Sequence, residues 1–134
     1  TKKRNHMFSH VMVGADDTAA AKGFYDATLG TLGIEPGFID DKGRVFYRTN
    51  TGVFGVTKPI DGKGATHANG GTIGFNAQST EQCDAWHTAG LQNGGENIEA
   101  PPGIRESGQM KMYIAYLRDP AGNKICALYR MPTE

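Results

Sequence analysis

His10 and Cys126 are side chains of types that bind metal ions or transfer protons, and each lies in an apolar segment. His10 lies in the stretch FSHVMVGADD, and Cys126 lies in the stretch NKICALYR. An imidazole can ligate a metal ion, act as a general base, or make a hydrogen bond in an ordinary core. A thiol can ligate zinc or act as a nucleophile, although a cysteine without a neighbouring base usually behaves as a small hydrophobic residue.

Arginine, tyrosine, histidine and threonine side chains supply further candidates for binding a small molecule. The guanidinium groups of Arg48 and Arg105 can anchor an anionic group, with a surface ion pair as the alternative. Tyrosine hydroxyls can point into a pocket, although packing in the core or between subunits uses the same residues. The candidates for ligand binding are Tyr47, Arg48, His67, Thr72, Arg105, Tyr113 and Tyr116.

The composition is that of a folded domain with no charge excess. The 134 residues include 14 Lys and Arg against 14 Asp and Glu, so the formal net charge is zero. This balance removes the usual electrostatic basis for binding nucleic acid or an anionic membrane. No apolar run approaches the roughly 20 residues that span a bilayer, and no signal-peptide pattern follows the basic first residues. We therefore expect a cytoplasmic protein with reduced cysteines.

Two segments have the spacing of amphipathic helices. Residues 16–33 begin with two aspartates that can cap a helix, and residues 79–95 begin with a Ser-x-x-Gln capping box at Ser79 and Gln82. His87 follows a tryptophan in the second helix and is expected on its exposed surface, off the buried stripe.

Short segments rich in valine, phenylalanine and isoleucine, separated by Gly, Asn and Asp, predict strands before and after each helix. The glycine-rich residues 58–71 have little periodicity and are interpreted as a linker or a binding loop. The clearest predicted strands are residues 6–15, 38–41, 44–50, 52–58, 72–77, 110–118 and 123–130.

The order of predicted elements repeats once along the chain. A shift of 62 residues aligns His10 with Thr72, and a shift of 71 residues aligns Gly55 with Cys126. Neither half can bury its sheet well alone, whereas a pair of halves can. The predicted ranges are residues 1–134 for a single domain, residues 6–60 for its first module and residues 71–130 for its second module.

The alternation of side chains along a strand assigns the candidate residues to a face. On the first strand Val11 points toward the helix, so His10 lies on the opposite face. By the repeat, Gly55, Thr72 and Cys126 take equivalent places on the faces turned away from the helices. We therefore expect these four residues to line one cavity enclosed by curved sheets.

Two motifs resemble those of a known family. HVMVGADDTAAAKGFYDATLG is similar to the opening of vicinal oxygen chelate proteins, the superfamily of glyoxalases, bleomycin resistance proteins and extradiol dioxygenases, and DPAGNKICAL resembles its closing turn and strand. The resemblance implies an α+β fold in which two βαβββ modules form an open, eight-stranded mixed sheet shaped as a cup, usually completed in a homodimer. It does not specify the reaction, because this superfamily includes lyases, dioxygenases, epimerases, thiol transferases and non-catalytic drug binders.

The resemblance also implies where a metal ion would bind. Metal-dependent members hold a divalent ion in the cup with His and Glu ligands, and His10 matches the first of these positions. Thr72 stands where such members have His, Cys126 stands where they have Glu, and Gly55 takes the fourth position. A neutral hydroxyl is a poor ligand and glycine offers none, so we expect a degenerate site. A divalent metal is bound at His10 only if ligands outside this set complete the site.

Three functions remain open. The first is a metal-free protein of this superfamily that binds a small organic molecule in the cup, with His10 and Cys126 as its catalytic candidates. The second is a metal-dependent enzyme of the glyoxalase, lyase or isomerase type, in which the ion acts as a Lewis acid. The third is a non-catalytic ligand- or antibiotic-binding protein, although a zero net charge does not favour capture of cationic drugs.

Overall fold

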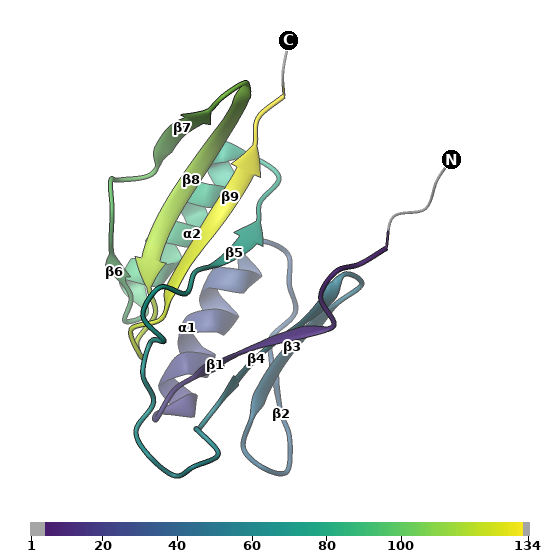
Figure 1. The fold of residues 1–134 in the computed structure, drawn as a ribbon, viewed down its shortest axis with the longest axis vertical. Helices are drawn as coiled ribbons and strands as arrows, with labels where there is room; N and C mark the ends of the chain where they lie inside the picture. The colour runs from purple at the N-terminus through teal and green to yellow at the C-terminus, as the bar shows by residue number, and fades with distance from the viewer. Residues whose placement is uncertain (1–4, 133–134) are drawn as a thin grey trace.

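Each half of the chain forms one helix and one β-sheet, in a computed structural model that describes residues 5–132 (Figure 1). The first half contains β1 (His10–Gly14), α1 (Thr18–Gly30), β2 (Phe38–Ile39), β3 (Val45–Thr49) and β4 (Gly52–Thr57). The second half contains β5 (Ile73–Asn76), α2 (Thr80–Gln92), β6 (Glu96–Asn97), β7 (Gly103–Ser107), β8 (Met110–Arg118) and β9 (Lys124–Arg130). The predicted α+β class and repeated order of elements are confirmed, with one short strand more than expected in the second half.

The residues predicted to cap the helices do so. Asp17 Oδ1 accepts a hydrogen bond from the backbone N–H of Ala20 at 2.9 Å, and Ser79 Oγ accepts one from the backbone N–H of Gln82 at 3.1 Å. These bonds satisfy N–H groups that the first turn of a helix leaves without a partner. The helices therefore begin where the sequence predicted.

The surface position predicted for His87 is wrong. Its side chain is buried, and its Nε2 lies 2.7 Å from Oδ1 of Asn97 in β6. The helical pattern alone could not indicate this, because β6 is only two residues long and packs against α2 at this point.

The two sheets repeat one topology. In the first sheet the strand order is β1-β4-β3-β2, with β1 parallel to β4; in the second it is β5-β9-β8-β6, with β5 parallel to β9 and with β7 also paired to β8. Met12 pairs with Gly55 in the first sheet, and Gly74 pairs with Cys126 in the second. These registers are the two sequence shifts of 62 and 71 residues, so the repeat is confirmed at the level of single residues.

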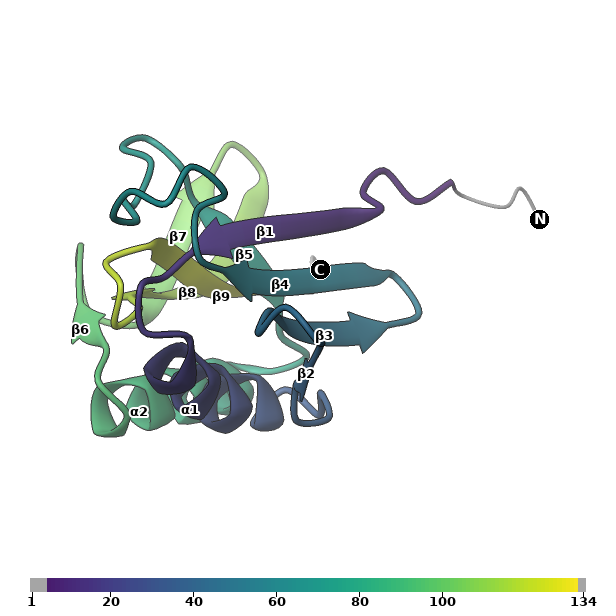
Figure 2. The same ribbon diagram turned by 90° about the horizontal axis from the view of Figure 1, so that it is seen from below.

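The expected eight-stranded sheet is divided within this chain. Among the described residues, β1 and β5 are edge strands of separate sheets, and no strand pairing joins the two sheets. The helices α1 and α2 contact each other and lie on the same side of both sheets (Figure 2). The modules are therefore joined by the packing of their helices.

One hydrophobic core serves both modules. It contains the fully buried side chains of Phe24 and Tyr25 on α1, Trp86 on α2 and Ile125 on β9. The ring of Tyr25 lies between the sheets, with centroids 4.8 Å from Phe54 of β4 and 6.4 Å from Phe75 of β5. Burial of large apolar side chains supplies most of the stabilisation of such a core.

The DPAGN segment is a structural knot between the modules. Asp119 accepts hydrogen bonds from the backbone N–H groups of Ala121 and Asn123, which close the turn between β8 and β9. Its other carboxylate oxygen accepts bonds from the hydroxyl of Tyr25 at 2.6 Å and from the side-chain amide of Asn123 at 2.9 Å. That same amide donates to the carbonyl of Gly14 at the end of β1. This motif therefore serves the fold and leaves no free group for a ligand.

Candidate functional site

His10 and Arg48 meet in a cavity on the non-helix face of the first sheet. The strand pairing of β1, β4 and β3 places His10 opposite Val53, and Val53 opposite Arg48. The cavity has a volume of about 490 Å³. Its lining residues are Ser9, His10, Met12, Phe38, Asp40, Arg44, Phe46, Arg48 and Val53. The structure thus gathers two of the predicted site residues with apolar walls between them.

The imidazole of His10 is exposed and held by its neighbour. The hydroxyl of Ser9 lies 2.9 Å from Nδ1 of His10, within hydrogen-bonding distance. This contact leaves Nε2 as the ring nitrogen available to another group. An exposed imidazole is the side chain best suited to gain or lose a proton near neutral pH.

The other walls of this cavity combine aromatic rings with an ion pair. The rings of Phe38 and Phe46 lie 5.7 Å apart, and the guanidinium of Arg44 lies 5.3 Å from the ring of Phe46. Arg44 also pairs with Asp40, with Nε and Nη2 at 2.7 and 2.6 Å from one carboxylate oxygen. Partial desolvation raises the pKa of Asp40, but the hydrogen bonds from Arg44 and from the backbone outweigh it and leave this pKa lowered. Among residues 5–132, Arg48 has no such carboxylate partner.

Cys126 lies on the corresponding face of the second sheet and is largely covered. It pairs with Gly74 on one side and with Tyr116 on the other. Its side chain is 5% exposed, and burial raises its pKa to about 11. The thiol is therefore protonated at neutral pH and is a poor nucleophile. All residues around the His10 cavity come from the first half of the chain, so that cavity does not bring Cys126 to His10.

The guanidinium of Arg105 is committed to its own loop. Its two terminal nitrogens donate hydrogen bonds to the carbonyl groups of Ala100, Pro101 and Gly103, at 3.1 to 3.2 Å. These bonds use the donors that an anionic ligand would need.

Tyr116 lies on the non-helix face beside three charged groups. Arg105 and Lys124 lie 6.0 and 5.1 Å from its ring, and Lys124 pairs with the carboxylate of Glu99. Burial raises the pKa of the Tyr116 hydroxyl, which is therefore neutral at physiological pH.

His67 and Thr72 share a small cavity apart from His10. Its volume is about 180 Å³, and it also includes the side chains of Arg118 and Lys124. Thr72 precedes β5, and His67 belongs to the glycine-rich loop before it. Nη1 of Arg118 donates to the carbonyl of Gly122 at 2.7 Å, so this cation already has one partner.

Tyr47 and Tyr113 are on the faces turned toward the helices. The hydroxyl of Tyr47 donates to Asp26 at 2.8 Å, and burial together with this carboxylate raises its pKa strongly. The hydroxyl of Tyr113 donates to Asp84 at 2.7 Å, and this bond raises its pKa to about 12. Both hydroxyls therefore tie a strand to a helix, on the opposite face from His10 and Cys126.

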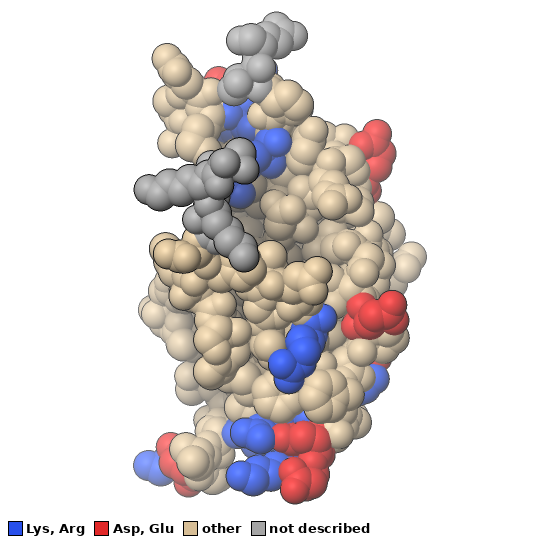
Figure 3. Space-filling model, turned by 90° about the vertical axis from the view of Figure 1, so that its right-hand side faces the viewer, with Lys and Arg blue, Asp and Glu red and all other residues tan. Residues whose placement is uncertain are grey.

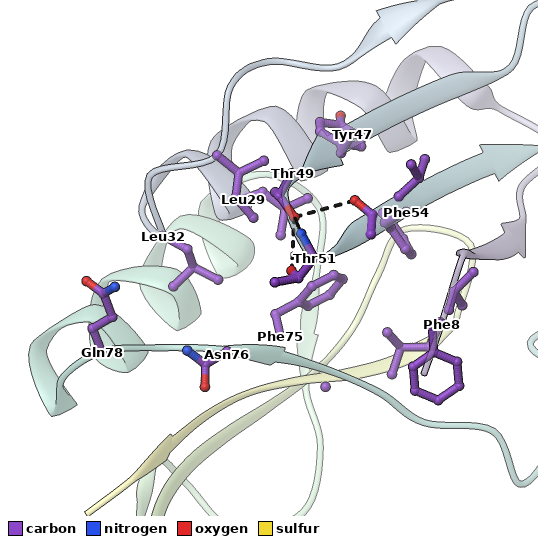
Figure 4. Close-up of a pocket in the computed structure, with 16 residues that line it drawn as sticks. Phe8, Leu29, Leu32, Tyr47, Thr49, Thr51, Phe54, Phe75, Asn76 and Gln78 are labelled. Carbon is purple, nitrogen blue, oxygen red and sulfur yellow. Dashed lines mark hydrogen bonds between the residues drawn. The ribbon is translucent and has the colours of Figure 1, made fainter. Parts of the chain in front are cut away.

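An uncharged cleft lies between the modules (Figure 4). Its volume is about 440 Å³, and it lies between the edge strands β1 and β5. Apolar side chains form its walls, and hydroxyl and amide side chains lie at its rim. The residues labelled in the close-up are Phe8, Leu29, Leu32, Tyr47, Thr49, Thr51, Phe54, Phe75, Asn76 and Gln78. No charged residue is among those that line it. We did not predict this cleft from the sequence, although exposed apolar residues such as Phe8 beside a strand indicate an unpaired edge.

The positions implied for a metal ion do not form a donor set. Among residues 5–132, no three His, Cys, Asp or Glu side chains come together as a metal-binding group. A Cβ at Gly55 would lie 2.4 Å from Sδ of Met12, so the Met12 side chain fills the space in which a ligand at position 55 would begin. His10 and Cys126 are the two family positions with a donor side chain, and transition-metal sites normally use three or more.

Comparison with known proteins gives the family. A family model described as the Glyoxalase/Bleomycin resistance protein/Dioxygenase superfamily matches residues 7–127. The chain belongs to this superfamily. The crystal structure of a glyoxalase/bleomycin resistance protein from Albidiferax ferrireducens T118 is 61% identical, covers 92% of this chain and 98% of that chain, and superposes with a TM-score of 0.89. No curated protein matches the chain.

More distant glyoxalase/bleomycin resistance/dioxygenase structures share the fold. A superfamily enzyme from Burkholderia phytofirmans PsJN is 18% identical over 92% of this chain and 98% of that chain, with a TM-score of 0.69. A lactoylglutathione lyase from Agrobacterium tumefaciens is 22% identical over 95% of this chain and 96% of that chain, with a TM-score of 0.65. The superfamily predicted from the two sequence motifs is therefore confirmed. Within residues 5–132 no helix is long and apolar enough to cross a membrane.

Proposed function

We propose that this superfamily member binds a small organic molecule on the non-helix face of its first sheet, in the cavity at His10 and Arg48. The observation that carries the proposal is the cavity itself, about 490 Å³ in volume, which combines an imidazole, a guanidinium without a carboxylate partner and a pair of phenylalanines. Mostly apolar pockets of this size with a few converging polar groups are typical of small-molecule sites.

The side chains divide the work of binding. Arg48 binds an acidic group of the ligand, because its planar guanidinium makes paired hydrogen bonds to a carboxylate or phosphate. Phe38 and Phe46 cover the apolar part. His10 Nε2 exchanges a hydrogen bond or a proton with a polar group of the ligand, so the chemistry that this arrangement supports is proton transfer without a metal ion.

We also propose that the site is completed in a homodimer. The edge strands β1 and β5 flank one uncharged apolar cleft, and each presents an unpaired backbone edge. A two-fold axis at this cleft would place β1 of each copy beside β5 of the other, which is the self-complementary contact that a symmetric dimer requires. The first sheet of one copy and the second sheet of its partner would then form the continuous eight-stranded cup.

Ligand-induced thermal stabilisation tests the binding proposal. We expect a member of a panel of small organic acids to raise the melting temperature of the wild-type protein by roughly 5–10 °C at 100 times its Kd. The variants His10→Ala and Arg48→Gln should lose most of this increase. Arg130→Gln, an exposed arginine at the end of β9, is the matched control and should retain it. An increase that survives in both His10→Ala and Arg48→Gln would place the ligand elsewhere and refute the proposal.

A further inference from the structure

A second cavity continues from the His10 cavity along the same face of the first sheet. It has a volume of about 580 Å³ and is lined by Lys42, Lys58 and Ile60 among others. Met12 and Arg44 line both cavities, so the two are adjacent. We call the second one the lysine cavity. It lies between the β2–β3 turn and the end of β4, at the lower end of the molecule in Figure 1.

The two cavities carry separate positive charges. Arg44, which they share, is neutralised by Asp40. Arg48 in the first cavity, and Lys42 and Lys58 in the second, form no ion pair with a carboxylate among residues 5–132. Figure 3 shows Lys and Arg side chains gathered at the lower end of the molecule, next to Asp and Glu side chains. Asp41 and Asp61 belong to the same two loops, but they do not line the lysine cavity.

The surface between the charges is apolar. Met12 lies at the junction of the cavities, and its flexible thioether adapts to the shape of a bound molecule. Phe46 continues this surface toward Arg48, and Pro59 continues it toward the lysines. A ligand that lies across both cavities therefore meets positive charge at each end and apolar surface in the middle.

From this arrangement we infer that the ligand carries two acidic groups joined by an apolar spacer. This inference rests on the proposed function. One acidic group binds Arg48 beside His10, and the other binds Lys42 and Lys58. The excess of cations also opposes the binding of a cationic antibiotic, since like charges without partners repel such a molecule.

Aliphatic acids of defined length test the inference. Titration calorimetry at low salt would compare dicarboxylates from succinate to suberate with monocarboxylates of the same chain lengths. We expect one dicarboxylate length to bind roughly tenfold more tightly than its monocarboxylate, at about threefold for each exposed lysine. The double variant Lys42→Gln/Lys58→Gln should bind that dicarboxylate only as tightly as the monocarboxylate. Lys111→Gln, on β8 of the second sheet, is the matched control and should leave both affinities unchanged.

The outcomes separate this inference from the proposed function. Equal affinities for monocarboxylates and dicarboxylates, both weakened by Arg48→Gln, would overturn the second acidic group and keep the His10 cavity as the site. A dicarboxylate preference that survives in the double lysine variant would also overturn the inference. If no acid of either series binds, the inference fails, and the wider ligand panel with His10→Ala decides the proposed function separately.

Discussion

The thiols of Cys83 and Cys126 are reactive groups that burial removes from chemistry at neutral pH. Both side chains are buried, and burial raises the pKa of each from 9.0 to about 11. A nearby carboxylate, Asp84, also raises the pKa of Cys83. At this scale His10 differs, because it is exposed beside a cavity and keeps one ring nitrogen free. The two catalytic candidates of the sequence therefore have unequal roles, and His10 is the one that can meet a ligand.

The pKa values of the thiols predict how alkylation depends on pH. Iodoacetamide reacts with thiolates, so native protein should react slowly at pH 8 and faster only as the pH rises toward about 11. Protein unfolded in urea should react readily near pH 8.5–9. Mass spectrometry of the labelled protein gives both rates, and Cys126→Ser separates the two sites. Equal rates in native and unfolded protein at pH 8 would contradict the burial of these thiols.

The same raised pKa values determine the sign of a stability change. Below pH 9 the thiols are protonated in both states, so they add no pH dependence. Between about pH 9 and pH 11 the unfolded chain loses protons that the folded protein keeps, so the free energy of unfolding falls as the pH rises.

At the scale of elements, strand alternation explains which site residues could be predicted. The pattern placed His10 and Cys126 on the non-helix faces, and the registers with Val53 and Gly74 confirm this. It also contained Phe46, because a strand that turns Tyr47 toward the helix turns both neighbours away from it. The sequence could not indicate the lysine cavity, because Lys42 and Lys58 belong to separate loops whose proximity depends on the pairing of β3 with β4.

The turn between β8 and β9 should be a large contributor to stability. Asp119 accepts four hydrogen bonds there, including one from Tyr25 of the first module. Asp119→Ala should lower the free energy of unfolding by about 2–4 kcal/mol, because it leaves buried donors without an acceptor. Urea denaturation measures this change. Asp41→Ala, an exposed aspartate in the β2–β3 turn, is the control and should change stability by less than about 0.5 kcal/mol. Equal effects of the two substitutions would show that the turn does not join the modules.

At the scale of the whole molecule, the sequence repeat predicted two modules but not how they pair. The cup expected to join His10 with Thr72 and Cys126 is not enclosed by one chain, since the helices of the two modules pack together and β1 and β5 remain edges of separate sheets. Pairing within one chain and pairing across two chains bury similar faces, so a pattern of apolar residues does not distinguish them. The uncharged cleft between the edges is the feature that favours a second copy.

The proposed dimer makes a prediction about Phe8. This side chain lies beside β1 at the cleft and is 63% exposed in the single chain. A charge there would be desolvated in a dimer that closes over the cleft, so Phe8→Glu should shift the protein to monomer at micromolar concentration. Ile104→Glu replaces a comparably exposed residue on β7, far along the second sheet from β5, and should leave the dimer intact. Sedimentation equilibrium over a range of concentrations measures both. A wild-type monomer, or a dimer lost in Ile104→Glu and kept in Phe8→Glu, would exclude this interface. Because the partner's second sheet would complete the cup, ligand stabilisation should weaken together with dimerisation in Phe8→Glu even though His10 and Arg48 are unchanged.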